Sequence, residues 1–239
     1  MVAFMSVPPL AVPGRNLPDR VLALLERVDY RRAETAEERE AIFRQRYHAY
    51  LREGAIAPNA SERFADVLDE SGNAWIFGVY VDGELASSIR LHVAARQFSD
   101  LPALNVFCDL LSPELAAGKS IIDPTRFVID RVASKRFPEL CYVTTRLAWL
   151  ASEYFQTHLL LATVRAEHQA FYRRVFGHRL ICEPRHYPSL AKPISLMALD
   201  YVLARERVPQ RYPFLRSTSL ERRMLFARAR PAIALKTAA

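Results

Sequence analysis

The sequence predicts an α/β fold in which a mixed β-sheet is flanked by helices on both faces. The segment His158–Val164 is almost continuously apolar, which is typical of a strand buried on both faces. An amphipathic helix at Pro138–Phe155 links it to a strand at Ser120–Asp130, and this strand, helix, strand order predicts a parallel crossover. Two strands at Trp75–Val81 and Leu85–Val93, joined by an Asp-Gly turn, predict an antiparallel hairpin. A sheet with both kinds of pairing is therefore expected.

The chain before the hairpin predicts two helices and a short strand. Apolar residues at helical spacing indicate a helix at Leu17–Val28, and Tyr30–Ala33 is a candidate strand. Thr35 has the position of an N-cap for a helix that reaches Glu53 and ends at Gly54.

The remaining segments are connections and the second half of the sheet. Ala55–Gly72 is polar and irregular, whereas Ala94–Gly118 is an irregular, partly helical insertion rich in leucine. Ordinary packing or a lid over an apolar ligand would both explain that apolar content. After the crossover, we expect a helix at Glu167–Phe176 and strands at Arg179–Cys182 and Ile194–Val202.

Length and composition favour one large domain. The chain has 239 residues, of which 51% are hydrophobic, enough to bury a substantial core. We expect an N-terminal helical extension at 1–28, a central α/β domain at 29–203, and a basic C-terminal tail at 204–239 that is helical around Ser219–Ala229. No apolar run approaches the roughly 18 residues of a membrane span, and no signal peptide is evident, so a cytoplasmic location is expected.

Cysteine usage and charge restrict the chemistry. The three cysteines lack C-x-x-C spacing, which disfavours a disulfide framework and a zinc site, and we expect no metal. Cys141 or Cys182 as a nucleophile is an open alternative. The net charge of +7 suggests an anionic partner: an acidic protein, a phosphate-bearing substrate, nucleic acid, or the surface of a membrane in peripheral contact. The arginines are dispersed, which disfavours nucleic acid.

The strand Ser120–Asp130 carries an acid and a base, Asp123 and Arg126, within an apolar run. Residues three apart on a strand point to opposite faces unless the pleat is broken. Pro124 donates no ladder hydrogen bond and is the predicted position of a break. A structural ion pair and a catalytic pair are both consistent with this spacing.

Four short motifs occur in a characteristic order: Arg46-x-x-x-Tyr50, Asp66-x-x-Asp69, Arg90 within a strand, and Asp123-x-x-Arg126-Phe127. The segment Phe171–His178 precedes a strand in the way typical of GNAT acyltransferases. Together these features resemble the acyl-homoserine-lactone (autoinducer) synthases and the related long-chain N-acyl amino acid synthases, over roughly Asp29 to Cys182.

The resemblance implies a GNAT-like fold and an enzyme that moves a long-chain fatty acyl group from a thioester to an amine. The glycine-rich pyrophosphate loop of GNAT proteins is missing at Val132–Phe137. This favours an acyl carrier protein, which presents acyl-phosphopantetheine, over acyl-CoA, with no tightly bound cofactor. Ile56 replaces an aromatic residue of the lactone synthases and Asp123 replaces a glutamate. We therefore expect an amino acid acceptor. The alternatives are a lactone synthase using S-adenosylmethionine, a CoA-dependent N-acetyltransferase, and an inactive ligand-sensing relative.

The resemblance also implies residue roles. Asp123 would orient the ammonium and accept its proton, and the backbone N–H groups of Phe127 and Val128 would stabilise the oxyanion. Arg126 would act with other arginines in a network that fixes the loop carrying Asp66 and Asp69 and binds a carboxylate of the substrate. The other members of the substrate-binding set are Arg46, Tyr50, Asp66, Asp69 and Arg90.

Further expected roles concern the thioester. Tyr172 is a candidate to protonate the leaving thiolate, with core packing as the alternative. Leu140, Thr144 and Leu147 would line the acyl chain. Four basic residues flank the central strand and would form a dock for the acidic carrier protein by charge complementarity. They are Lys119, Arg131, Lys135 and Arg136.

Overall fold

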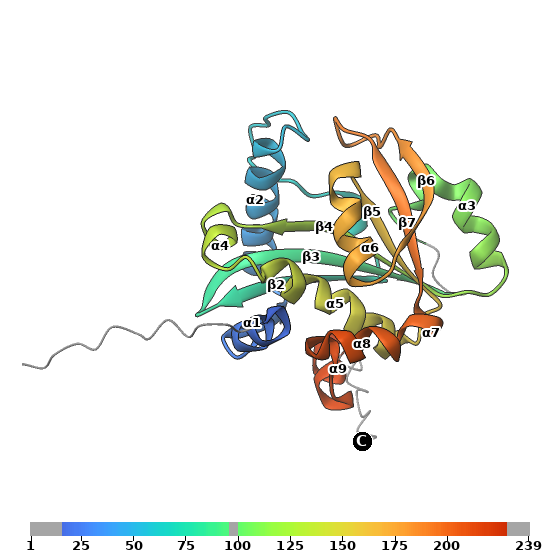
Figure 1. The fold of residues 1–239 in the computed structure, drawn as a ribbon. Helices are drawn as coiled ribbons and strands as arrows, with labels where there is room; N and C mark the ends of the chain where they lie inside the picture. Colours follow the sequence, from blue (N-terminus) through green and yellow to red (C-terminus); the bar gives the residue numbers. More distant parts are fainter. Residues whose placement is uncertain (1–15, 96–99, 229–239) are drawn as a thin grey trace, which may run out of the picture.

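A seven-stranded mixed sheet forms the centre of the molecule, as predicted (Figure 1). The computed structural model describes residues 16–95 and 100–228. The strand order is β1-β2-β3-β4-β5-β7-β6, and within it only β4 and β5 run parallel. The strands are β1 Val28–Arg32, β2 Ala74–Val81, β3 Glu84–Ala94, β4 Ile121–Ile129, β5 Leu159–Val164, β6 Arg179–Arg185 and β7 Ile194–Asp200.

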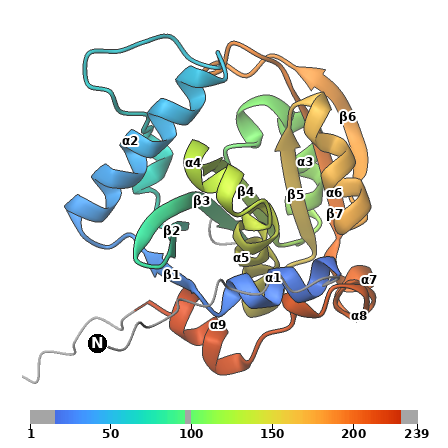
Figure 2. The same cartoon turned by 60° about the vertical axis from the view of Figure 1, so that its left-hand side comes forward.

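Helices connect and cover these strands on both sides (Figure 2). Helix α2 begins with a capping box, in which Thr35 and Glu38 satisfy each other's backbone N–H groups, and Gly54 follows its end with a φ of 61°. The α-helices are α1 Leu17–Leu25, α2 Ala36–Arg52, α3 Leu104–Ala116, α4 Arg131–Arg136, α5 Leu140–Phe155, α6 Gln169–Val175, α7 Tyr201–Ala204, α8 Arg207–Arg211 and α9 Ser219–Phe226. Short 3-10 turns lie at η1 Val67–Glu70, η2 Ala166–His168 and η3 Pro213–Leu215.

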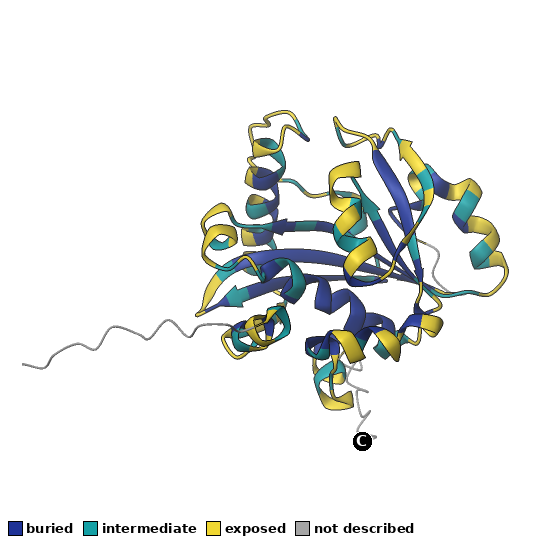
Figure 3. Cartoon of the chain, in the orientation of Figure 1, coloured by how far each residue is buried: buried dark blue, intermediate teal, exposed yellow. Residues whose placement is uncertain are grey.

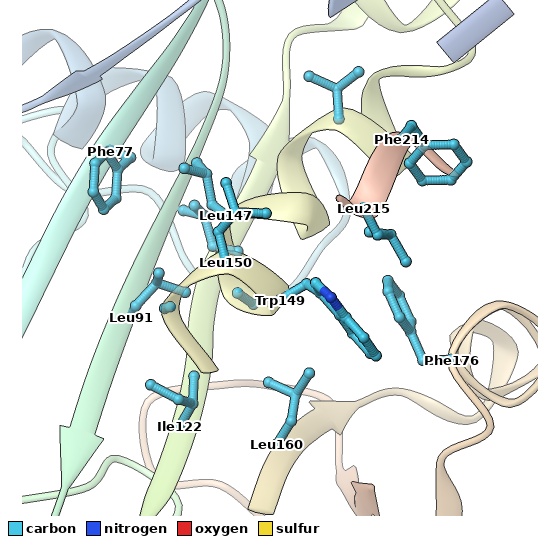
Figure 4. Packing of buried hydrophobic residues seen from close by; sticks show 14 of the residues in the cluster. Phe77, Leu91, Ile122, Leu147, Trp149, Leu150, Leu160, Phe176, Phe214 and Leu215 are labelled. Carbon is cyan, nitrogen blue, oxygen red and sulfur yellow. The ribbon is translucent and has the colours of Figure 1, made fainter. Parts of the chain in front are cut away.

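The two faces of the sheet carry different side chains. On β3, Leu91 packs with Leu147 and Trp149 of α5 in the main hydrophobic core, part of which is shown in Figure 4. The neighbouring residue Arg90 points to the opposite face, where it meets Asp66 in the loop after α2. One face of β3 is therefore apolar and covered by α5, and the other carries charged groups beneath α2.

The N-terminal helix and the described C-terminal segment belong to the main core rather than to an extension and a tail, which differs from our expectation. Val21 of α1 and Phe214 and Phe226 of the C-terminal segment are almost fully buried in the same cluster as α5. Arg146 of α5 donates to the carbonyl of Phe214 at 2.6 Å and pairs with Glu221 at 2.6 Å. The buried Arg146 thus joins α9 to α5. Figure 3 shows that α5 and the central strands are largely buried.

The described part of the leucine-rich insertion contains helix α3 and packs on the sheet, which supports ordinary packing over a lid. Phe107 and Leu111 are buried against Ile121 and Leu161 in a second core cluster. The segment Val132–Phe137, which lacks a glycine loop, overlaps helix α4, and Asp130 caps this helix through the N–H groups of Val132 and Ala133. Among the described residues, no helix has the length and apolarity needed to cross a membrane.

Candidate active site

The central strand β4 is broken at Arg126. The pairing with β3 shifts between Ser88 and Arg90, so that Arg126 is an extra residue in a β-bulge, with a φ of 53°. Arg90 pairs with Thr125 and His92 with Asp123 on the charged face. The bulge turns Arg126 onto this same face. The predicted break is therefore present, but it lies at Arg126 and not at Pro124.

A cavity of about 550 Å³ opens between β4 and β5. The two strands pair only at Ile121 with Leu159 and Ile122 with Leu160, and beyond these positions they separate. The walls of the cavity come from β4 and from the ends of α2, β5 and α6. Its lining includes Tyr50, Glu53, Arg126, Phe127, Val128, Cys141, Arg165, His168, Tyr172 and Lys192.

The separation of the strands exposes one backbone edge of β4 to this cavity. Asp130 donates its N–H to Ala86 of β3, and the carbonyl of Val128 accepts from Ser87 Oγ at 2.7 Å. Peptide groups of Val128 and Asp130 thus face β3, and alternation along the strand turns those of Phe127 and Ile129 toward the cavity. Of the two expected backbone donors, Phe127 therefore faces the cavity and Val128 faces β3, and Ile129 is the second residue on the cavity side.

Three arginines and two aspartates form a network below the cavity. Arg46 Nη1 lies 2.7 Å from Asp69 Oδ1, and Arg90 Nη1 lies 2.6 Å from Asp66 Oδ1 and 3.0 Å from Asp69 Oδ1. Arg126 Nη2 lies 2.5 Å from Asp66 Oδ2. The structure therefore brings together all five of these predicted site residues.

The network is held largely out of water. Arg46 and Arg90 are completely buried, and only Arg126 of the three arginines lines the cavity. Burial opposes the charged form of Asp66, but hydrogen bonds and charge from Arg90 and then Arg126 keep the pKa of its carboxyl well below its usual range. Burial lowers the pKa of Arg46 to about 10 despite its pairing with Asp69. Arg46 and Arg90 therefore fix the loop, and Arg126 is the member that can reach a substrate.

Aromatic rings hold the Arg126 guanidinium in place. It stacks on Phe64 with 4.1 Å to the ring centroid, and it lies 5.7 Å from the ring of Tyr50. Tyr50 comes from α2, one turn after Arg46, so both residues of the predicted helix motif face the site. Such stacking adds about 0.5–2 kcal/mol to each contact.

Asp123 lies outside the cavity, contrary to our expectation of contact with the substrate amine. Its side chain is completely buried, and its Oδ2 accepts the N–H of Ala103 at 2.8 Å, just before α3. Burial raises the pKa of Asp123 to about 7, although the hydrogen bond from Ala103 and the charge of Arg90 act in the opposite direction. Its surroundings are those of a carboxyl group that anchors the start of α3.

Groups that sequence reasoning did not single out line the cavity instead. Arg165 Nη2 donates to Glu53 Oε2 and to His168 Nε2, each at 3.1 Å. Burial, and then the charge of Arg165, lower the pKa of His168, so the imidazole is neutral at pH 7. A sequence signal existed, because Arg165 and His168 directly follow β5 and ligands bind beyond the carboxyl ends of parallel strands.

Tyr172 lies in the cavity wall and is a member of the aromatic cluster around α6. Burial raises the pKa of its hydroxyl above the usual value, so the group is a protonated phenol at neutral pH. Its ring lies 5.2 Å from that of Phe171 and 5.6 Å from that of His178. Tyr172 thus both packs in the aromatic cluster and lines the cavity.

The residues expected to line the acyl chain are core residues. Leu140 and Leu147 are fully buried in the main cluster, and Thr144 shares a hydrogen bond of 2.8 Å with Ser87. None of the three lines the cavity. The residue of α5 that lines it is Cys141. Helical spacing identified the buried face of α5, but it could not show which edge of that face the cavity reaches.

The four basic residues of the expected carrier dock do not form one patch. Arg131, Lys135 and Arg136 are exposed on α4, beyond the carboxyl end of β4. Lys119 precedes β4 and pairs with Glu114 at 2.5 Å. The nine residues of β4 extend roughly 30 Å between the two positions. Only the α4 group lies near the cavity, to which Ser134 contributes.

Metal and thiol chemistry find little support in the described part of the chain. No group of three or more histidine, cysteine or acidic side chains there could hold a metal ion. Burial raises the pKa of Cys141 to about 11, so the thiol next to the cavity is protonated at neutral pH and is a weak nucleophile.

Comparison with known folds agrees with this geometry. The structure of FeeM, an N-acyl amino acid synthase from uncultured soil microbes, is similar over 79% of this chain and 98% of its own, with a TM-score of 0.65 and 20% identity. The AHL synthase LasI is similar over 74% of this chain and 93% of its own, with a TM-score of 0.51 and 14% identity. TofI, solved in a ternary complex with an inhibitor and MTA, is similar over 73% of this chain and 91% of its own, with a TM-score of 0.52 and 14% identity. At these identities the likeness shows the fold alone, which is GNAT-like.

Sequence comparison adds the family. No curated protein matches the chain in a direct sequence search. The family model described as N-acyl amino acid synthase FeeM matches residues 41–200, which include the bulged strand, the arginine network and the cavity. The chain therefore belongs to the FeeM family of N-acyl amino acid synthases and is an N-acyltransferase.

Proposed function

We propose that this protein transfers a long-chain fatty acyl group from an acyl carrier protein thioester to the amine of an amino acid, giving an N-acyl amino acid. The observation that carries the proposal is the cavity between β4 and β5, which offers an exposed strand edge, a phenol and several cations in one enclosure. The amine attacks the thioester carbonyl, a C–N bond forms, and the C–S bond breaks to release the thiol.

The exposed edge of β4 supplies the oxyanion site in this proposal. The N–H groups of Phe127 and Ile129 are directed at the cavity, where the carbonyl oxygen of a thioester would accept from them. Fixed donors of this kind are worth about 2.7–4 kcal/mol of transition-state stabilisation each. The thioester would lie along β4, in the space that a paired strand would otherwise fill.

Two side chains of the cavity would move protons. His168 is neutral and lies beside Arg165, so it would accept the proton that the amine loses, directly or through a water molecule. Tyr172 would give a proton to the leaving thiolate, as the sequence suggested. Asp123 is buried and does not line the cavity, and we assign it a positioning role at the start of α3 rather than proton transfer.

The charge of the lining supports an acceptor that carries a carboxylate. Arg52, Arg126, Arg165 and Lys192 line the cavity, whereas Glu53 is the one acid in the lining. Arg126 is already paired with Asp66, and Lys192 donates to the backbone carbonyl of Glu53 at 3.0 Å. A cationic enclosure is suited to an amino acid and to the phosphate of phosphopantetheine.

The proposal that an acyl carrier protein is the acyl donor depends on helix α4. This helix occupies the position at which a glycine-rich loop would present its backbone N–H groups to a pyrophosphate. Arg131, Lys135 and Arg136 are exposed on it, and they would bind an acidic carrier protein next to the cavity.

The direct test is an assay with the purified protein, an acyl carrier thioester and a panel of amino acids, read by mass spectrometry. An N-acyl amino acid that forms from the carrier thioester much faster than from acyl-CoA supports the full proposal. A matched acceptor, the amino acid amide, lacks the carboxylate and is expected to react roughly 10-fold to 150-fold more slowly, because a charged hydrogen bond of about 1.5–3 kcal/mol is lost. A lactone formed from S-adenosylmethionine, or equal rates with the amide, would contradict the acceptor assignment.

A further inference from the structure

The outer surface of α7, α8 and α9 combines exposed apolar side chains with arginines. We call this surface the α7–α9 face. Four of its apolar residues are among the most exposed large hydrophobic residues described, with Leu203 at 78% and Met224 at 76%. The face is made by Val202, Leu203, Leu220 and Met224 together with Arg205, Arg207, Arg211, Arg216 and Arg223.

Helix α9 shows the pattern most clearly. Leu225 and Phe226 point inward to the core. Leu220, Arg223 and Met224 are three and four positions apart, which places them on one outward side of the helix. The helix thus has a second apolar side that packs against nothing in the described part of the molecule, with an arginine beside it.

The charge of this region is strongly positive. Residues 201–228 contain seven arginines, no lysine and two glutamates, and one of those glutamates, Glu221, is bound by Arg146 from the core. Within residues 16–95 and 100–228, none of the five arginines of the α7–α9 face forms an ion pair. Their charges are therefore available to an external anionic partner.

The α7–α9 face also lies away from the cavity. Figures 1 and 2 both show α7, α8 and α9 along one side of the molecule, next to α5 and α1. Tyr201 of α7 donates its N–H to His158 at the start of β5, whereas the cavity is lined by Thr163 and Val164 at the end of that strand. An occupant of the face would leave the cavity open to substrates.

We propose that the α7–α9 face binds the surface of a membrane that contains anionic lipids. Exposed leucine, valine and methionine side chains would enter the boundary between head groups and acyl chains, and the arginines would meet the lipid phosphates. Nucleic acid would use the cations but would gain nothing from four exposed apolar side chains. The proposal is independent of the acyl transfer reaction, and its test does not use activity.

The experiment is co-sedimentation of the full chain with vesicles of phosphatidylcholine, with and without phosphatidylglycerol. We expect binding to the anionic vesicles that weakens as salt is added, and much weaker binding to phosphatidylcholine alone. The variant Leu203→Glu/Met224→Glu should lose about 10-fold or more in partitioning, and Arg207→Glu/Arg211→Glu about five-fold for each arginine removed. Val67→Glu is the matched control, because Val67 is 86% exposed on η1 at the opposite face of the sheet.

Three results would overturn the proposal. The first is equal partitioning of all variants, or no partitioning at all. The second is a change in oligomeric state in Leu203→Glu/Met224→Glu without vesicle binding by the parent protein, since this would make the face a contact between two copies of the chain. The third is binding of an oligonucleotide in place of vesicles. Thermal melts of the same variants check that each one is folded.

Discussion

The substitution Asp123→Asn separates the two roles that a carboxyl group at this position could have. The change keeps the size of the side chain and an oxygen that can accept the Ala103 N–H, and it replaces the other oxygen, which has no partner among the described residues, with an NH2 group that cannot ionise. If Asp123 is a buried neutral acid, the variant gains stability at high pH. If it is an ionised base, the variant loses activity.

The expected size follows from the pKa of about 7, raised by burial from 3.8. Between roughly pH 4 and pH 7 the folded protein holds a proton that the unfolded chain has released, so the stability of the parent protein falls as pH rises through this window. Above about pH 7 this loss of stability no longer changes with pH. Each pKa unit corresponds to about 1.4 kcal/mol, so about 4 kcal/mol is the upper bound, and we expect a gain of about 2–4 kcal/mol for Asp123→Asn at pH 8.

The assay is urea unfolding of both proteins at about pH 4 and about pH 8. The difference in unfolding free energy should be near zero at the lower pH and should reach its full value at the higher one. A variant that is less stable at pH 8, or a difference that does not change with pH, would refute the assignment. Loss of acyl transfer by a fully folded Asp123→Asn protein would restore Asp123 as the proton acceptor.

The other predictions concern the cavity. Tyr172→Phe should lower kcat by roughly 10²-fold with little change in KM, because only the thiolate step loses its acid; steady-state kinetics would contradict this role if KM alone changed. Since the pKa of His168 is lowered from 6.5, the parent rate should fall only below about pH 6.5, and His168→Gln should remove that limb from the pH profile; an unchanged profile would exclude His168. Arg126→Gly should keep more stability than Arg126→Ala in thermal melts, by about 1 kcal/mol, because position 126 has a φ of 53°. The reverse order would mean that the bulge does not persist without the arginine.

Much of the fold could be predicted because its signals are local. The Asp82-Gly83 turn has positive φ at both residues, as the hairpin requires, and the middle of β5 is buried as expected of a central strand. The C-terminal segment was harder. Its arginine-rich sequence suggests a solvated tail, and its place in the core depends on contacts with Arg146, which lies some 70 residues earlier in the chain.

The site was predictable only in part, because only some of its signals are local in the sequence. Motif spacing found the network of Arg46, Asp69, Arg90 and Arg126, because ion pairs of this kind need charged residues wherever the loop meets the sheet. The position of the bulge could not be predicted. Pro124 is the residue that breaks a ladder by its chemistry, yet an extended backbone accommodates proline, and the positive φ falls on Arg126, where Asp66 and Phe64 hold the side chain.

This bulge connects the architecture of the sheet to the choice of acceptor. With a regular pleat, Arg126 would face α5 and its apolar core, where an unpaired charge is prohibitive. The extra residue turns it toward Asp66 and the cavity. Because Asp66 and Asp69 also pair with the fully buried Arg46 and Arg90, two carboxylates are shared among three guanidinium groups. Of the three arginines only Arg126 faces the cavity, beside Tyr50, so the surplus positive charge reaches the cavity there, and a carboxylate on the acceptor is the group that would balance it.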